Sequence, residues 1–511
     1  MGRRKGGRRA RLVPAETEAE KISIPAAQRG LHAGPTPPYD PLSVSRVDRL
    51  IEATLEVMRD AGVAFDPDPP VMDLFRDAGC TVSDEGVVRF PSEVVRRCLD
   101  SMARSVRLWD RNGTDFIEID NRHTWFIPGM TCIRVYDETG EPRDSTREDL
   151  ARITRVADAL PNVDAVTVTV KNVERSDIHG EVDEFMALAE NTTKPLEYLC
   201  EYPESLSVVI DMAAAIRGGH EALAEKPYFL QLVTPLPMYY AKAHTDQILT
   251  AVEAGVPVGM GTVTIGGAAA PITMGGCIVH SLATDFAGMV LAQLARPGCF
   301  CIGGSDPNFM EVATGGVGSF TQTSLGDMAM CQVARRLEYP SLTGIGGCSV
   351  ARRFNQDAVW ELSASMMQTW YSRPATCDYM GSLDQGLTYS LHALLFCDEL
   401  AGALRRMWEG VGVDDERLAL ELTRQEGPRG DYLTQAHTAK HCRTEPWDAR
   451  FLGPHIPVST GGDPDRDLFE RIEEELCNIL ERHQPEPMPP RVRAALRGLQ
   501  DDFEATHSVQ E

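Results

Sequence analysis

A regular succession of short apolar segments in the middle of the chain constrains its fold more than any other feature. Roughly 25–40 residues of mostly helical pattern separate one segment from the next. Most of the segments are apolar throughout, as parallel strands buried on both faces should be. The segments are 124–130, 165–170, 196–202, 228–235, 257–263, 299–304, 341–347 and 375–381.

Eight strand-to-helix units of this kind predict a closed (β/α)8 TIM barrel, which belongs to the α/β class. The chain has 511 residues, enough for such a barrel with additional parts. An open, doubly wound parallel sheet is the alternative architecture. No Gly-x-Gly-x-x-Gly turn with the acidic residue of a dinucleotide site supports that alternative.

The flanking sequences lack the regular alternation of apolar segments and helical patterns. Residues 1–42 are basic at the start and rich in Pro further on, which predicts a disordered tail. Residues 43–120 predict an N-terminal α+β subdomain, 121–410 the barrel, and 411–511 a C-terminal helical cap.

Local signals mark helix ends. Ser145 and Glu148 have the spacing of a capping box before a helical pattern, and Gly255 is expected to end another helix.

Charge and cysteine content narrow the class of protein. A net charge of −25 disfavours a nucleic-acid partner, although the basic start "MGRRKGGRRARL" leaves a nucleic-acid-binding arm as an alternative to a plain tail. No uninterrupted apolar stretch has the length of a membrane helix, and no signal core follows the basic start. Thirteen scattered cysteines without a Cys-x-x-Cys pair predict reduced thiols in the cytoplasm. A homo-oligomer is expected from the size of the barrel.

The strand ends carry no familiar catalytic set. His437 and His441 are four residues apart but lack a third ligand, so no metal site is predicted. There is no Gly-x-Ser-x-Gly nucleophile motif. Cys348 stands at a glycine-flanked strand end, where a reactive thiol and a buried spectator are both compatible with the sequence.

Aromatic residues and glycines are more informative. Rings at or just beyond strand ends can bind a quaternary ammonium group by cation–π attraction, although rings that line a core would look the same. Glycine clusters at strand ends either let a large rigid group approach the backbone or make tight corners. The rings are Tyr202, Phe309, Phe354, Tyr379 and Tyr389, and the glycines are Gly266, Gly267, Gly346 and Gly347.

Several longer stretches resemble the trimethylamine methyltransferase family, which comprises corrinoid-dependent methylamine and betaine demethylases. The resemblance covers residues 43–455. It is carried by "RLIEATLEVMRDAGVAF", "DLARITRVADALPNVDAV", "MGTVTIGGAAAPITMGG", "VLAQLARPGCFCIGGSDPNFMEVATGG", "LTYSLHALLFCDELAGALRRMWEGV" and "DYLTQAHTAKHCRTEPW".

The resemblance implies a TIM barrel that moves a methyl group from a methylated amine to the Co(I) centre of a separate corrinoid protein. It also implies that the chain itself holds no tightly bound cofactor. The trimethylamine enzymes proper contain pyrrolysine, and this sequence has none. The equivalent stretch is placed at 344–353, where relatives often carry Asp-Ser/Ala-Lys and this chain has Cys348-Ser349-Val350-Ala351-Arg352. The departure bears on the substrate rather than on the fold.

A quaternary ammonium leaves as a neutral amine, so its demethylation needs no general acid and depends on positioning. The sequence assigns candidate roles on that basis. Tyr202, Phe354, Tyr379 and Tyr389 would form an ammonium cage, and Glu201, Asp306 and Asp378 would add negative potential unless they are solvated helix caps. Arg352, Arg353 or His437 would hold a betaine carboxylate unless they are simply exposed. Residues expected to face the corrin are Gly266, Gly267, Gly346, Gly347, Cys348 and Ser349.

Two other functions remain open at this point. A zinc-dependent methylcobalamin:thiol methyltransferase would share the barrel, but its metal-ligand spacing is missing. A non-catalytic amine sensor or scaffold would keep the fold and tolerate the altered stretch at 348–353.

Overall fold

The structure of the protein is a computed structural model, which describes residues 29–32, 37–129, 131–137, 140–317, 320–343, 346–447, 449–450 and 467–507. Most of the predicted disordered tail, residues 1–42, lies outside this description.

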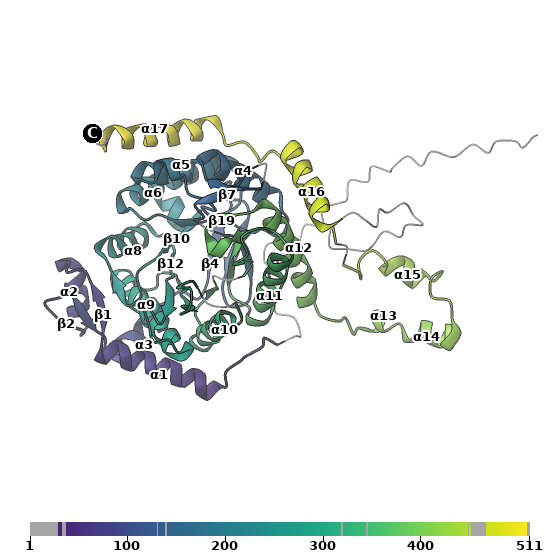
Figure 1. Cartoon of the computed structure of the whole chain (residues 1–511), viewed down its shortest axis with the longest axis horizontal. Coiled ribbons are helices and arrows are strands. Elements are labelled where there is room, and N and C mark those ends of the chain that lie inside the picture. The colour runs from purple at the N-terminus through teal and green to yellow at the C-terminus, as the bar shows by residue number, and fades with distance from the viewer. Residues whose placement is uncertain are drawn as a thin grey trace, which may run out of the picture.

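Eight parallel segments form a closed ring at the centre of the molecule (Figure 1). Isolated parallel bridges tie segment 164–170 to β9 and link β14 to β16, while Asp164 N–H donates to the Phe126 carbonyl at 2.9 Å. The order round the ring is β6, segment 164–170, β9, β10, β12, β14, β16 and β17, which pairs with β6. The bounds are β6 Trp125–Pro128, β9 Leu196–Leu199, β10 Phe229–Val233, β12 Val258–Met260, β14 Cys301–Gly303, β16 Leu342–Thr343 and β17 Thr376–Met380.

A helix follows each of these segments and lies outside the ring, so the predicted (β/α)8 barrel is confirmed (Figure 1). All eight apolar segments found in the sequence coincide with positions in the ring. The outer helices are α4 Arg147–Ala159, α5 Ile178–Asn191, α6 Pro203–Arg217, α8 Lys242–Ala254, α9 Met274–Ala295, α10 Phe320–Leu337, α11 Gln356–Ser372 and α12 Leu391–Trp408, with the short α7 His220–Glu225 after α6.

Local caps explain where two of these helices begin and end. The capping box of α4 uses Thr146 and Asp149, one residue later than the predicted pair Ser145 and Glu148. The Ser145 hydroxyl donates instead to the Lys171 carbonyl at 2.6 Å, which fixes the end of segment 164–170. Gly255 ends α8 with φ of 78°, as predicted, because its left-handed backbone suits glycine.

Two apolar layers stabilise the barrel. The larger lies between the strands and the outer helices. The smaller fills the inside of the ring, where Trp125, Leu199, Leu230 and Ile302 meet side chains of a hairpin, β4 Val106–Trp109 with β5 Phe116–Ile119.

The residues before β4 form a layer beside α9. The three helices of this layer, α1, α2 and α3, pack against α9. By length and composition α9 could cross a membrane, but 89% of its most apolar window is buried in the protein. Phe65 stacks on Tyr240 at 5.1 Å where β1 pairs with β11. The elements are α1 Val44–Asp60, β1 Val63–Phe65, α2 Pro69–Asp77, β2 Thr81–Val82, β3 Val87–Arg89, α3 Ser92–Ser101 and β11 Tyr239–Tyr240.

The C-terminal helices do not cover an end of the barrel. Figure 1 shows α13, α14 and α15 extending away from it as an arm, while α16 packs on α4 and α12, and α17 on α5 and α6. Their bounds are α13 Asp415–Leu418, α14 Leu420–Glu426, α15 Ala436–His441, α16 Leu468–Arg482 and α17 Pro490–Thr506, and the single-turn helices are η2 Val173–Arg175, η3 Asp384–Gly386 and η4 Gly427–Arg429.

Candidate active site

Two small sheets extend the barrel beyond the carboxyl ends of its strands. A parallel ribbon continues β12 and β14, and a four-stranded sheet in the order β18-β19-β7-β8 follows β6 and β17. The carboxyl ends of barrel strands are where this fold carries its chemistry. The added strands are β13 Val263–Gly266, β15 Asp306–Phe309, β7 Arg134–Tyr136, β8 Pro142–Asp144, β18 Ser382–Leu383 and β19 Thr388–Tyr389.

Two carboxylates project into the barrel from β9 and β17. Glu197 lies between Leu196 and Tyr198, which belong to the outer core, so strand alternation turns its side chain inward. Asp378 follows the outer-core residue Cys377 and is turned inward in the same way. Their exposed fractions are 2% and 0%.

These two carboxyl groups have strongly perturbed pKa values. Burial raises the pKa of Glu197 to about 8 and that of Asp378 well above its ordinary value. The charges of Glu197 and Asp306 raise the pKa of Asp378 further, and no cation in the described part of the chain offsets either shift. One oxygen of each carboxyl and the hydroxyls of Thr167 and Thr169, on the inward side of segment 164–170, have no hydrogen-bond partner among the described residues.

Asp306, on β15, lies at the centre of a wider group of buried acids. Burial raises the pKa of Asp285 on α9 to about 8 and that of Asp327 on α10 well above its ordinary value, and the charge of Asp306 adds to both shifts. Asp285 also accepts a hydrogen bond from the Ser305 hydroxyl, and Gln368 donates to Asp327 at 3.2 Å. The site therefore carries a strong negative potential whenever its acids ionise.

Tyr379 lies near acids of this site, whose charges add to burial in raising its pKa. Its φ of 71° is rare for a bulky residue and costs of the order of 1–3 kcal/mol, so the surrounding packing must hold it. The register of β17 against β6 shifts between Cys377 and Met380. This bulge changes the direction of the Tyr379 side chain relative to a regular strand. The Tyr379 side chain packs on the inner core. Burial is the main reason that its pKa is raised, and the charge of Asp306 is the second.

The glycines before Cys348 are required by packing against β17. A Cβ at Gly346 would lie 2.0 Å from the Cys377 Sγ, and one at Gly347 would lie 2.8 Å from the Met380 Cα. The φ of Gly347 is 91°, which also favours glycine. Protein atoms thus occupy the space beside both glycines, and their predicted contact with a corrin stays a prediction.

The two residues after Gly347 differ in their chemistry. Burial raises the pKa of the Cys348 thiol to about 12, so the sulfur is protonated and poorly nucleophilic. The charges of Cys132 and Glu361 raise this pKa further, and the charge of Asp306 adds a smaller effect. The Ser349 hydroxyl donates to Glu361 at 2.5 Å, and the same carboxylate accepts the Val350 N–H at 2.9 Å. Glu361 on α11 therefore fixes the loop that carries Cys348.

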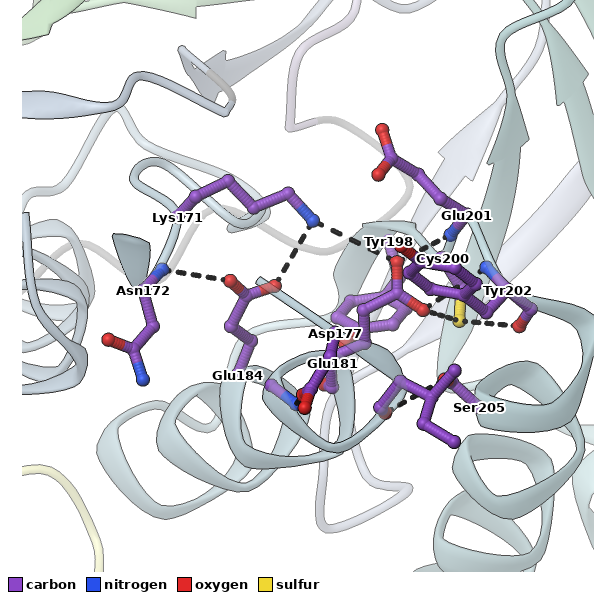
Figure 2. Close-up of polar contacts among 12 residues, drawn as sticks. Lys171, Asn172, Asp177, Glu181, Glu184, Tyr198, Cys200, Glu201, Tyr202 and Ser205 are labelled. Atoms are coloured by element: carbon purple, nitrogen blue, oxygen red, sulfur yellow. Dashed lines mark hydrogen bonds and ion pairs between the residues drawn. The ribbon is translucent and has the colours of Figure 1, made fainter. Parts of the chain in front are cut away.

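A second polar network lies beside the mouth, at the ends of segment 164–170 and β9 (Figure 2). Lys171 reaches Glu184 at 3.3 Å and Glu181 at 3.9 Å, both on α5. Glu181 accepts the backbone N–H groups of Glu201 at 2.7 Å and Tyr202 at 3.2 Å. Burial lowers the pKa of Lys171, but the charges of Glu184, Glu181 and Glu201 outweigh it and raise the pKa. Lys171 thus holds the end of β9 through α5.

Several predicted cage residues lie apart from the acid group. Tyr202 is 39% exposed at the start of α6, and Glu201 is exposed on the rim beside it. Phe354 packs on Phe396 at 5.7 Å and on His392. Tyr389 is buried in the outer core and donates to the Met380 carbonyl at 3.0 Å. Contact of these residues with a substrate stays a prediction.

The predicted carboxylate-binding residues Arg352 and His437 contact other groups. The Arg352 side chain is 89% exposed and lies 3.7 Å from Asp384. His437 is on α15 in the arm, where its Nε2 lies 3.1 Å from the Glu416 carbonyl oxygen (Figure 1). In the same arm, His441 contacts the Glu416 carboxylate at 3.0 Å. No group of three potential metal ligands gathers within the described ranges.

Gly266 and Gly267 lie at the turn after β13. Gly267 is exposed with φ of 94°, and its N–H donates to the Ala270 carbonyl at 2.8 Å. Gly266 is buried against backbone atoms. The structure thus brings together four of the predicted site residues, Asp306, Cys348, Asp378 and Tyr379.

Sequence reasoning missed Glu197, Asp327 and Lys171. Glu197 had a detectable signal, because "LEYL" places a carboxylate in the middle of a strand buried on both faces. Asp327 has no such signal, since acidic residues are ordinary in helices. Lys171 directly follows an apolar strand, but its partners on α5 become neighbours only through the fold.

Comparisons with known proteins agree on the class of protein. A family model described as trimethylamine methyltransferase matches residues 4–506. The chain is 27% identical over 467 residues to the trimethylamine methyltransferase of Desulfitobacterium hafniense (strain DSM 10664 / DCB-2), covering 89% of this chain and 92% of that one. It is 26% identical over 473 residues to the glycine betaine methyltransferase of Desulfitobacterium hafniense (strain Y51), covering 91% and 97%.

A solved structure with the same fold is the monomethylamine methyltransferase of Methanosarcina barkeri. Its TM-score is 0.51, with 13% sequence identity and coverage of 87% of this chain and 88% of that one. At this identity the likeness supports the barrel fold.

Proposed function

Because the chain belongs to the trimethylamine methyltransferase family and is a methyltransferase, we propose that it moves a methyl group from a quaternary or tertiary amine to the Co(I) corrinoid of a partner protein. The proposed substrate class rests on one observation: two inward carboxyl groups, of Glu197 and Asp378, lie near Tyr379.

A fixed positive charge complements this group. At an effective dielectric near 20, a unit charge about 4 Å from a carboxylate gains about 4 kcal/mol. A quaternary ammonium has no proton to donate, so it is held by charge and by an aromatic face rather than by hydrogen bonds. Glu197, Asp378 and Tyr379 supply both kinds of attraction in a water-poor interior.

The role of the protein follows from the charge of the leaving group. The Co(I) corrinoid supplies the nucleophile. With a quaternary substrate the departing amine is neutral, so the chain needs no general acid, and the protonated Cys348 thiol is not required to give up its proton. Glu197 and Asp378 bind the cation and orient one methyl group toward the mouth, while the apolar inner layer below them excludes water.

The charge balance of the site favours an amine with net positive charge over a zwitterionic betaine. A betaine carboxylate would need a cationic partner, and the predicted candidates Arg352, Arg353 and His437 are bound elsewhere. Arg353 pairs with Glu141, Arg352 faces Asp384, and His437 is in the arm. We therefore propose amines such as choline or tetramethylammonium ahead of glycine betaine.

A rim of exposed apolar side chains supports the corrinoid partner. Such side chains occur in the connections that follow β6, β9, β10, β12, β14, β16 and β17, at the mouth end of the barrel. A protein that presents a broad corrin over the mouth would cover this rim, and the exposed Gly267 would lie against it. The rim residues are Ile133, Tyr202, Leu236, Val263, Ile272, Val312, Val317, Val350 and Leu387.

A cytoplasmic location and a homo-oligomeric state belong to the same proposal. The thirteen cysteines are all free thiols, which supports a reducing compartment.

A methyl-transfer assay tests the proposed function. The purified chain is mixed with a reduced corrinoid protein and, separately, with choline, tetramethylammonium, trimethylamine and glycine betaine. We expect the corrin absorbance to change and the demethylated amine to appear by mass spectrometry with at least one cationic amine. No turnover with any amine, under conditions in which a family member is active, would favour the non-catalytic scaffold.

Binding of the cation is expected to release protons. In the free protein, burial keeps the carboxyl of Glu197 protonated up to its pKa of about 8, and a bound cation favours the ionised form. Affinity for tetramethylammonium should therefore rise with pH between 6 and 8, by about tenfold per pH unit for each proton released. Calorimetry in two buffers of different ionisation enthalpy measures the release. An affinity independent of pH between 6 and 8 would contradict this mode of binding, and Glu197→Gln should make the rise less steep.

A further inference from the structure

Two cysteines lie close together at the amino-terminal end of β14, the end opposite the mouth. Cys299 precedes the strand and Cys301 begins it, and their sulfur atoms are 3.9 Å apart. Cys301 is fully buried, whereas Cys299 is half-buried behind the exposed turn 295–298. One sulfur of the pair is therefore near solvent and the other is held behind it.

The side chain of Gln293, on α9, is oriented toward both sulfurs. Its carbonyl oxygen accepts the Gly298 N–H at 2.9 Å and the Ser101 hydroxyl at 3.1 Å. Because a backbone N–H can only donate, the amide group must point the other way. Its nitrogen donates to the Cys299 carbonyl at 2.8 Å and lies 3.0 Å and 3.7 Å from the sulfurs of Cys299 and Cys301.

These contacts distinguish the two thiols. The hydrogen bond from Cys301 lowers the pKa of Cys299, against the effect of burial, and the positive charge of Arg296 and the amide of Gln293 lower it further. The same bond raises the pKa of Cys301, with burial adding to the shift. Cys299 therefore has the lower pKa of the two thiols and is the sulfur that ionises first, while Cys301 lies 3.9 Å from it as the second sulfur.

We propose that Cys299 and Cys301 form an oxidant-reactive dithiol, in which Cys299 attacks a hydroperoxide and Cys301 resolves the product to a disulfide. Proximity, a fixed hydrogen-bond donor and partial exposure, here of Cys299 beside the exposed turn 295–298, are features that reactive cysteines share. The site is separate from the mouth and does not depend on the proposed methyl transfer.

The reaction balances with one peroxide. The Cys299 thiolate attacks an oxygen of hydrogen peroxide and the O–O bond breaks. The departing hydroxide takes the proton that Cys299 had released, leaving a sulfenic acid and one water. The Cys301 sulfur then bonds to the Cys299 sulfur, and the displaced hydroxide leaves with the Cys301 proton as a second water. The two thiols together lose two electrons and two protons.

The chain supplies its own controls. Cys442 and Cys477 are exposed, and neither has a second sulfur within hydrogen-bond distance among the described residues. The pKa of Cys477 is raised, by desolvation first and then by the charge of Glu473. Exposure alone predicts that these two cysteines oxidise first, whereas the proposed dithiol predicts that Cys299 does.

Differential alkylation of the native chain tests the proposal. The protein is exposed to hydrogen peroxide, quenched, unfolded, alkylated and mapped by mass spectrometry. We expect the peptide with Cys299 and Cys301 to lose two hydrogens. Its thiols should become inaccessible to alkylation about ten times faster than those of the peptides with Cys442 and Cys477. A reducing agent should restore its alkylation.

Two variants separate the roles of the sulfurs. Cys301→Ser should leave Cys299 as a sulfenic acid that dimedone traps, and Cys299→Ser should leave Cys301 reduced. Oxidation of Cys442 or Cys477 ahead of an unchanged 299–301 peptide would overturn the proposal. The same preference for Cys299 in the urea-unfolded chain would also overturn it, because the folded contacts would then not be its cause.

Discussion

The substitution Asp378→Asn is expected to lower kcat/KM for a cationic amine about 100-fold, equivalent to about 2.7 kcal/mol. Asp378 is fully buried and faces the barrel interior with Glu197. The negative charge that Asp378 gains when a cation binds has no substitute there apart from Glu197 and Asp306. The positive charge of the amine decreases as the methyl group leaves. The loss should therefore appear mainly as a higher KM, with a smaller change in kcat, in steady-state kinetics with the corrinoid protein.

Stability provides the control for this variant. A carboxyl whose folded pKa is raised keeps its proton in the folded state, and folding becomes less favourable as pH rises from its unfolded value through its folded value. Replacing the carboxyl by an amide should leave the protein at least as stable as the unsubstituted chain at pH 8. Asp327→Asn is the matched variant, because Asp327 is also buried with a raised pKa but lies on α10, outside the ring, and contacts Gln368 of α11 rather than the barrel interior. An equal loss in kcat/KM for Asp327→Asn would contradict a specific role for Asp378.

The substitution Lys171→Met is expected to lower the free energy of unfolding by about 3–5 kcal/mol, because it leaves two buried carboxylates without their cation. Glu184 and Glu181 are 2% and 3% exposed, and burial already raises the pKa of both against the effect of Lys171. Without the lysine their pKa values rise further. The loss of stability should grow as pH rises from about 5 to 9 and shrink when both groups are protonated.

Chemical denaturation followed by circular dichroism measures this loss. Lys171→Arg keeps the charge and should retain most of the stability. The double variant with Lys171→Met and Glu184→Gln removes a buried charge together with its partner and should recover part of the loss (Figure 2). A change below about 1 kcal/mol in Lys171→Met would show that the network contributes no more than an exposed ion pair.

The barrel could be predicted because its signal repeats along the sequence. Each strand is buried on both faces, so it is a short apolar run wherever it occurs, and segment 164–170 was found although only isolated bridges join it to its neighbours. The exact residue at which a helix begins was harder to predict. Ser145 and Thr146 both have an acidic residue three positions on, and the hydrogen bond from Ser145 to Lys171, which decides between them, depends on the fold.

The candidate site could be predicted only in part. Asp306, Asp378 and Tyr379 were found because they lie at strand ends, but strand ends also carry residues that face outward. Tyr389 comes from the same region and packs in the outer core, because β19 folds back against β18. The direction of Tyr379 depends on a bulge in β17, which no pattern in "CDYMG" indicates. Which side chains meet is thus set by register and bulges rather than by composition.

Comparison of choline with 3,3-dimethylbutan-1-ol tests most directly whether the site accepts a fixed positive charge. The two molecules have nearly the same shape, and a carbon atom in the alcohol replaces the ammonium nitrogen. Calorimetry at pH 8 should show choline binding at least about 100-fold more tightly, and this preference should largely disappear in the double variant Glu197→Gln with Asp378→Asn. Equal affinities for the two molecules, or a preference for choline that survives the double variant, would contradict the account.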